Sequence, residues 1–222
     1  WLEAARAADE RARQLGGKPV ALSFRNTDAV RTVELRGYEY TREPSAVSGQ
    51  PWIRYDSTRP TVWQLPLRYA VQPALAVTAP ATGYFVPSAH AAWMSEKLAL
   101  HGIDFQRVIA PQPASAVQTF RADRTTTAAE TFEGRSLMTV DGAWRDETRN
   151  IGPGALFVPI AQPKARLVMS LLEPQAPDSF VSWGYFSAAF ERKEYMENYV
   201  TEAVARQMLS QDPALKAEFE RR

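Results

Sequence analysis

A two-residue alternation interrupted by a proline is the sequence feature that most constrains the fold. In the stretch VWQLPLRYA, Trp63, Leu65, Leu67 and Tyr69 alternate with small or polar residues. This period is typical of a β-strand that turns one face toward a core. Pro66 cannot donate a hydrogen bond to a neighbouring strand, so we expect this strand at the edge of a sheet.

A second alternating stretch, RTVELRGYEYT, changes phase in its middle. Val33 and Leu35 occupy odd positions, whereas Tyr38 and Tyr40 occupy even ones, and the change falls at Gly37. A slip of one residue at a glycine predicts a β-bulge. The polar residues from 43 to 60 are interpreted as a long surface connection in which two aromatic side chains anchor the chain, namely Trp52 and Tyr55.

The chain as a whole is predicted to have an α+β fold. Residues 1–17 form a connecting helix that ends at a glycine pair, and residues 18–80 form a β-rich subdomain, either sandwich-like or an open antiparallel sheet. Residues 81–222 form a mixed subdomain with three main helices, which is expected to pack with residues 18–80 as one unit. The helices are placed from an N-cap at Ser88 to about Leu100, from Pro163 onward, and over about 193–210, with short strands near 105–109, 117–121, 137–140 and 155–160.

Composition excludes several classes of site. Among 222 residues there is no cysteine, which rules out disulfides, thiolate nucleophiles and Cys-based metal centres. The formal net charge of +1 argues against a nucleic-acid partner bound over a broad basic face. No apolar run approaches the roughly 20 residues that span a bilayer. The chain begins at Trp1 inside a helix-like stretch, so we expect residues to precede it.

The residues offer no recognisable catalytic centre. The two histidines, His90 and His101, are expected at the start and end of one helix, and His101 is interpreted as a helix C-terminal residue rather than a metal ligand. Nucleophile-elbow and phosphate-loop motifs are missing. We therefore predict no catalytic residue and no metal ligand in this chain, although a carboxylate pair drawn from distant strands stays open.

The segment from Phe180 to Tyr199 is dense in aromatic residues interleaved with charges. One interpretation is a core strand followed by a helix N-terminus. The other is a surface for a neighbouring domain or a ligand, because exposed aromatic residues are enriched at interfaces. The candidate residues for that surface are Trp183, Tyr185, Phe186, Glu191 and Tyr195.

Several short strings occur in a characteristic order along most of the chain, from about residue 31 to residue 219. They are Gly-Tyr-Glu-Tyr-Thr-Arg-Glu-Pro-Ser-Ala at 37–46, Gly-Tyr-Phe-Val-Pro at 83–87, Leu-His-Gly-Ile at 100–103, Phe-Glu-Gly-Arg at 132–135, Gly-Ala-Leu-Phe-Val-Pro-Ile-Ala-Gln-Pro at 154–163, Leu-Leu-Glu-Pro at 171–174, Ser-Trp-Gly-Tyr-Phe at 182–186 and Phe-Glu-Arg-Lys-Glu-Tyr-Met-Glu at 190–197. This series resembles the region that follows the catalytic domain in bacterial zinc carboxypeptidase-like metallopeptidases. The resemblance rests on the order and spacing of the strings.

The resemblance implies a parent hydrolase that cleaves peptide bonds with one zinc ion and is periplasmic or secreted. Its zinc ligands and catalytic glutamate would belong to an N-terminal catalytic domain, which would be the main partner of this chain. The expected function is therefore that of an accessory C-terminal domain that stabilises or shapes the catalytic domain. The alternatives are a glycan- or peptide-binding module of an exported protein and, with least support, an independent hydrolase.

Overall fold

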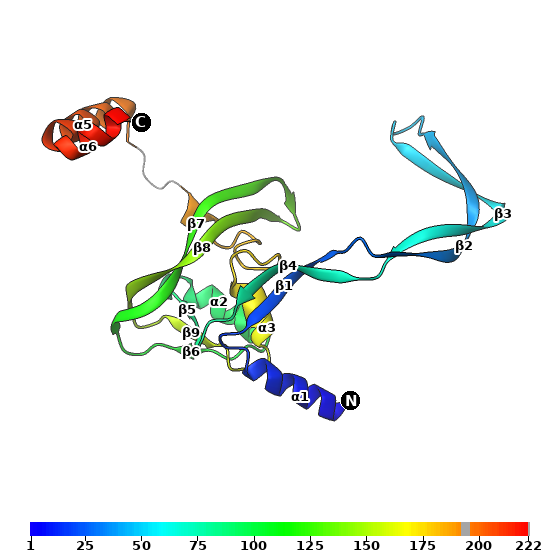
Figure 1. Ribbon diagram of the computed structural model, residues 1–222, viewed down its shortest axis with the longest axis horizontal. Helices are drawn as coiled ribbons and strands as arrows, with labels where there is room; N and C mark the ends of the chain where they lie inside the picture. Colours follow the sequence, from blue (N-terminus) through cyan, green and yellow to red (C-terminus); the bar gives the residue numbers. More distant parts are fainter. Residues whose placement is uncertain (192–195, 222) are drawn as a thin grey trace.

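The computed structural model describes residues 1–191 and 196–221 and has a mixed α+β, strand-rich fold (Figure 1). In chain order the elements are α1 (Leu2–Arg13), β1 (Pro19–Asn26), β2 (Val30–Pro44), β3 (Pro51–Arg68), β4 (Val71–Thr78), β5 (Gly83–Val86), α2 (Ser88–Leu100), β6 (Gln106–Arg107), β7 (Gln112–Phe132), β8 (Arg135–Ile151), β9 (Leu156–Pro159), α3 (Ala165–Leu172), α4 (Ser187–Phe190), α5 (Asn198–Gln211) and α6 (Pro213–Arg221).

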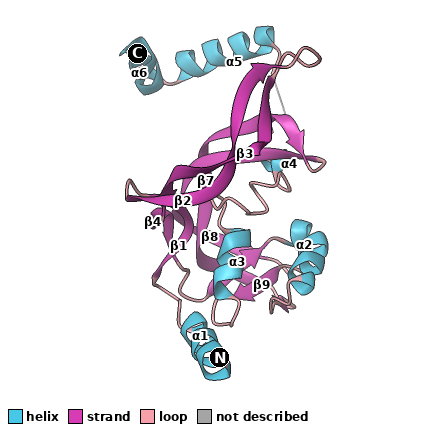
Figure 2. Cartoon of the chain, turned by 90° about the vertical axis from the view of Figure 1, so that its right-hand side faces the viewer, coloured by secondary structure: helices cyan, strands magenta, loops and turns pink. Residues whose placement is uncertain are grey.

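The main core lies between a small antiparallel sheet, ordered β5-β9-β6, and the helices α2 and α3 (Figure 2). Alternate residues of β5 and β9 face the helices, so Val86, Leu156 and Val158 are buried. The apolar spacing along each helix buries Leu98 on α2 and Val168 on α3. Full burial of each such side chain contributes about 2 kcal/mol, which makes this layer the stable centre of the molecule.

The antiparallel pair of β1 and β4 connects the first part of the chain to this core. Val20 on β1 and Ala79, which directly follows β4, belong to the same buried cluster as the residues of α2 and α3. The Arg166 guanidinium on α3 also donates a hydrogen bond to the carbonyl oxygen of Ala21 at 2.5 Å. Residues from both sides of position 80 therefore share one core.

The strands β2 and β3 form a long antiparallel hairpin, here called the arm, which extends from the β1–β4 pair away from the core (Figure 1). No side chain of either strand is classed as buried. Within the described residues, β2 and β3 pair only with each other. The proline-containing strand β3 therefore has an unpaired edge, as the sequence predicted.

The strands β7 and β8 form a second long hairpin, which curves over the core instead of leaving it (Figure 1). Met138 and Val140 on β8 are buried against Val181, and Trp144 packs against the main core. The Met138 N–H also donates to the carbonyl oxygen of Ser182 at 2.9 Å. These contacts hold one face of β8 against the body of the protein.

The bulge predicted at Gly37 is displaced. The register of the arm shifts between Tyr38 and Glu39, where three residues of β3 have no partner on β2. Gly37 itself lies against the indole of Trp63, and a Cβ at this glycine would be 2.6 Å from that ring. The glycine therefore permits close packing of the indole, and the shift in strand register lies one residue after it, between Tyr38 and Glu39.

The predicted surface connection over residues 43–60 is wrong for most of its length. Strand β2 continues to Pro44 and β3 begins at Pro51, so only residues 45–50 form the turn. Trp52 pairs with Glu43 and Tyr55 pairs with Tyr40 across the strands. Both faces of the arm are exposed, so its strands carry polar residues that resemble the composition of a loop.

Other boundaries also differ from those expected. Pro87 and not Ser88 is the N-cap of α2, and α3 begins at Ala165. Helix α5 begins at Asn198, and the helix start predicted near residue 193 lies outside the described residues. The short strands expected near 117–121 and 137–140 are parts of the much longer β7 and β8, and the strand near 105–109 is reduced to Gln106–Arg107. Residues 176–186 form turns that lead into α4, so this part of the aromatic segment is no strand.

Candidate functional site

A buried carboxyl group, Glu173, lies directly after α3 at the centre of a polar network. Its side chain is only 4% exposed. The Tyr84 hydroxyl on β5 donates to Oε1 at 2.5 Å, and Nε1 of Trp144 on β8 donates to Oε2 at 3.0 Å. Three segments far apart in the sequence thus meet at one carboxyl group, with both oxygens satisfied.

Burial dominates the electrostatics of this network. Loss of hydration raises the pKa of Glu173 above its usual value of 4.5, while the donors Tyr84 and Trp144 act in the opposite direction. Burial also raises the pKa of the Tyr84 phenol, and the adjacent carboxylate adds to this effect. Tyr84 therefore stays a protonated donor, and the network positions three structural elements.

A groove of about 1020 Å³ lies beside this network. One wall consists of Thr78 and residues 80–88, which include the whole of β5. The other consists of residues of β7 and β8 together with Gly152 and Ala155. Tyr84, Trp144 and Glu173 line it, together with polar side chains of the hairpin. This volume is at the upper end of the range found for sites that bind small organic ligands.

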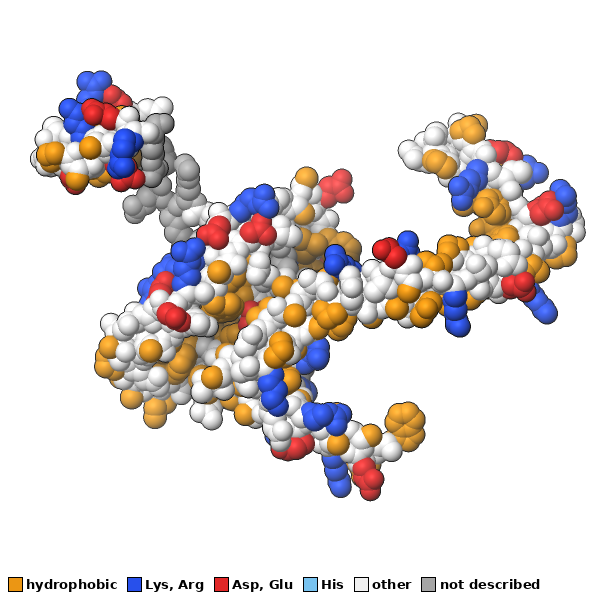
Figure 3. All heavy atoms as spheres, viewed as in Figure 1, with side chains coloured by type: hydrophobic (Ala, Val, Ile, Leu, Met, Phe, Trp, Pro, Cys, Tyr) orange, Lys and Arg blue, Asp and Glu red, His pale blue; other side chains and the backbone are white. Residues whose placement is uncertain are grey.

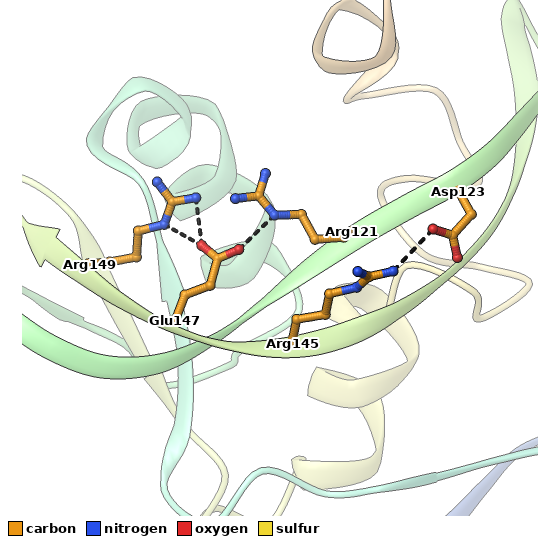
Figure 4. Close-up of polar contacts among 5 residues, drawn as sticks. All are labelled: Arg121, Asp123, Arg145, Glu147 and Arg149. Atoms are coloured by element: carbon orange, nitrogen blue, oxygen red, sulfur yellow. Dashed lines mark hydrogen bonds and ion pairs between the residues drawn. The ribbon is translucent and has the colours of Figure 1, made fainter. Parts of the chain in front are cut away.

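Paired charges bridge β7 and β8 (Figure 4). The carboxylate of Glu147 contacts Nε of Arg121 at 2.7 Å and the guanidinium of Arg149 at 2.6 Å, and Arg145 contacts Asp123 at 3.3 Å. The hydrogen bond from Arg121, with support from Arg149, lowers the pKa of Glu147 to about 2. The arginines and Asp123 are largely exposed and Glu147 is partly exposed, so each pair contributes little to stability, and together they help to keep the two strands in register.

Two of the candidate surface residues lie inside an aromatic cluster. The ring of Tyr185 stacks on Trp93 of α2 with centroids 5.0 Å apart, and Phe186 contacts both Trp93 and His90 edge to face. The Arg135 guanidinium lies 3.5 Å from the centroid of the Tyr185 ring. Hydrogen bonding to Arg135 lowers the pKa of the Tyr185 phenol, despite its partial burial. These side chains join α2 to the start of β8.

The other candidate residues are not brought together with them in the same way. Trp183 is half-buried and lies near Phe132 at the end of β7, with ring centroids 6.0 Å apart. Glu191 is exposed at the C-cap of α4. Tyr195 lies outside the described residues. None of the four described candidates lines the groove beside Glu173.

The two histidines lie where the sequence placed them, at opposite ends of α2. His90 packs edge to face against Phe186, with centroids 4.7 Å apart. His101 is the C-cap residue of α2, and its carbonyl oxygen accepts a hydrogen bond from Nζ of Lys164. Across residues 1–191 and 196–221, no group of three or more His, Asp or Glu side chains is arranged to hold a metal ion.

Sequence reasoning missed the network of Tyr84, Trp144 and Glu173. The first two residues are separated from Glu173 by 89 and 29 positions, so no local spacing relates them. The string Leu-Leu-Glu-Pro carried one signal. Its glutamate follows two leucines and precedes a proline, at the end of an otherwise apolar helix. A carboxyl group in that place is either exposed at the helix end or buried and hydrogen-bonded.

No protein-family model matches this chain, and no similar curated protein or solved structure was found. None of the described helices has the length and apolar character that crossing a bilayer requires.

Proposed function

We propose that this chain is a non-catalytic accessory domain that packs against the catalytic domain of a zinc carboxypeptidase-like peptidase and stabilises it or shapes its cleft. The zinc ion and the residues that hold it would belong to that neighbouring domain. The proposal combines the ordered strings of the sequence with one structural observation, which is the exposed apolar surface of the arm.

The arm carries large apolar side chains that no described part of the chain covers. Tyr40, Tyr55 and Trp63 lie on one stretch of it with ring centroids 5.9–6.1 Å apart. Tyr55 is 55% exposed and Trp52 near the tip is 51% exposed. Figure 3 shows hydrophobic side chains along much of the visible face of the arm.

An uncovered hairpin of this kind is unfavourable for a chain that acts alone. Isolated two-stranded hairpins are marginally stable in water, and contiguous apolar surface on a soluble protein is typical of an interaction site. A neighbouring domain seated on the arm would cover the aromatic side chains and satisfy the unpaired strand edges. This is the observation that favours an accessory, interdomain role over an independent enzyme.

The first test of this proposal uses the 222-residue chain alone. We expect it to take up no stoichiometric zinc and to release no C-terminal residue from peptides, as measured by metal analysis after dialysis and by mass spectrometry of the products. Tight binding of one zinc ion together with such cleavage would overturn the proposal.

The second test uses the longer protein that contains the catalytic domain. Replacing Trp52 and Tyr55 by serine should lower the melting temperature of the catalytic domain, because buried aromatic residues at interfaces contribute about 2 kcal/mol or more each. Phe219→Ser is the matched control, since Phe219 is an aromatic residue on α6 that is 65% exposed. A double variant that behaves like the control would contradict docking through the arm.

A further inference from the structure

The outer edge of β5 faces the groove described above and has no strand beside it. Strand β5 pairs with β9 on one side, from Gly83 opposite Pro159 to Val86 opposite Leu156. Within the described residues no strand pairs with the other side. Residues 83–86 all line the groove, so the unpaired edge is accessible from it.

The register of the sheet shows which backbone groups point into the groove. The N–H of Ile160 donates to the carbonyl oxygen of Thr82 at 2.9 Å, one pair before Gly83 and Pro159. Hydrogen-bonded and non-hydrogen-bonded pairs alternate along an antiparallel ladder. Tyr84 and Val86 therefore bond to β9, whereas the N–H and C=O groups of Gly83 and Phe85 are directed to the open side.

The charge of the groove favours one sign of ligand. Among its acidic and basic side chains, Glu173 is buried and hydrogen-bonded to Tyr84 and Trp144. Arg149 pairs with Glu147, which also pairs with Arg121. Asp146 lines the groove, is exposed, and accepts a hydrogen bond from Nε2 of Gln118 at 2.9 Å. In the part of the chain that the structure describes, Asp146 makes no ion pair, so the groove has an uncompensated carboxylate.

We propose that this groove binds an extended peptide segment with a lysine or arginine side chain, which adds to the outer edge of β5 as a further strand. The edge is four residues long, about 13 Å at the usual rise per residue, and fits a segment of about four or five residues. Gly83 and Phe85 supply the backbone hydrogen bonds, and Asp146 on the opposite wall receives the basic side chain. This site is separate from the arm and does not depend on the proposed accessory function.

The test is a titration of the isotope-labelled chain with the blocked pentapeptide acetyl-Val-Thr-Lys-Thr-Val-amide. At about 1 mM peptide we expect shifts in the amide signals of residues 83–86 and slower hydrogen exchange at the Gly83 and Phe85 amides. Two further peptides carry N-methyl groups on alternate amides, one on the odd and one on the even residues. At least one of these should bind at least tenfold more weakly, because the N-methyl groups remove the donors that face β5.

Charge selection is tested by two changes made separately. Replacing the lysine of the peptide by glutamate, or Asp146 by asparagine, should weaken binding about threefold to fivefold, as expected for an exposed ion pair. Asp123→Asn is the matched control, because Asp123 does not line the groove. No shift at residues 83–86, or binding of both N-methylated peptides as tightly as the parent peptide, would overturn strand addition. Equal binding of the lysine and glutamate peptides would overturn the assigned ligand class.

Discussion

The arm and the β7–β8 hairpin have the same local architecture and opposite surroundings. Each is a long antiparallel pair connected by a short turn. The β7–β8 hairpin places Met138, Val140 and Trp144 against the body of the protein, whereas the arm has no buried side chain. Alternation along a strand therefore determines that a hairpin forms, but the rest of the chain determines whether one of its faces is covered.

This difference separates two kinds of apolar residue. In β8, an apolar side chain contributes to the stability of this chain because folding removes it from water. In the arm, the same residue types stay exposed and contribute little to folding, and under the proposed function they contact the neighbouring domain. Substitutions in the two hairpins should therefore have different consequences, and the predictions below are ordered by the size of the expected effect.

The largest effect is expected from a matched pair of tryptophan substitutions. Trp144→Ala removes a ring that packs on the core and deprives Oε2 of Glu173 of its donor, so we expect a loss of about 3 kcal/mol in the free energy of unfolding. Trp63→Ala removes ring contacts that lie within the arm, and we expect a loss below about 1 kcal/mol. Urea denaturation of both variants measures the difference, and equal losses would remove the distinction between the hairpins.

A second prediction concerns pH and the core side of the β7–β8 hairpin. Because burial raises the pKa of Glu173 above 4.5, the folded chain keeps a proton that the unfolded chain releases as the pH rises through this value. The wild-type chain therefore loses stability with rising pH between 4.5 and the raised pKa. Glu173→Gln cannot titrate, so its stability relative to the wild type should rise from about pH 4 to about pH 7. Urea denaturation at about pH 4 and about pH 7 checks this. If the difference in stability between the variant and the wild type were the same at both pH values, burial would not raise the pKa of Glu173.

The ion pairs of β7 and β8 should have the opposite pH dependence. The pKa of Glu147 is lowered to about 2 from 4.5, so its contribution is present above 4.5 and is lost as the pH falls toward 2. Glu147→Gln should therefore destabilise the chain at neutral pH and have a decreasing effect as the solution is acidified. The same denaturation series measures it, and an effect that grows in acid would contradict the assigned pairing with Arg121 and Arg149.

The smallest effect is expected at the exposed pair of Arg145 and Asp123, whose side chains are 59% and 65% exposed. Asp123→Asn should change the free energy of unfolding by less than about 0.5 kcal/mol, because both charges of an exposed ion pair are well solvated whether or not the pair forms. A loss above about 1 kcal/mol in urea denaturation would mean that the charges, and not the buried face, hold the second hairpin in place.

Sequence reasoning was most successful where local pattern and burial agree. The presence of α2 and α3 and the position of β3 at an edge followed from residue pattern and proline chemistry. The predictions failed where an element contacts residues far away in the sequence, or where it contacts no other element. The strands of the arm near Trp52 and Tyr55 appeared to be a loop because neither face is buried, and the contacts of Glu173 depend on residues that only the fold brings together.

Hydrogen exchange across the two hairpins tests most directly the claim that the arm depends on a partner outside this chain. In the isolated 222-residue chain we expect amides of β7 and β8 to exchange at least about tenfold more slowly than those of β2 and β3. In the longer protein that the proposed function implies, with its catalytic domain, the β2 and β3 amides should become protected to a similar degree. Arm amides that are as protected as those of β7 and β8 in the isolated chain, and unchanged in the longer protein, would contradict the account.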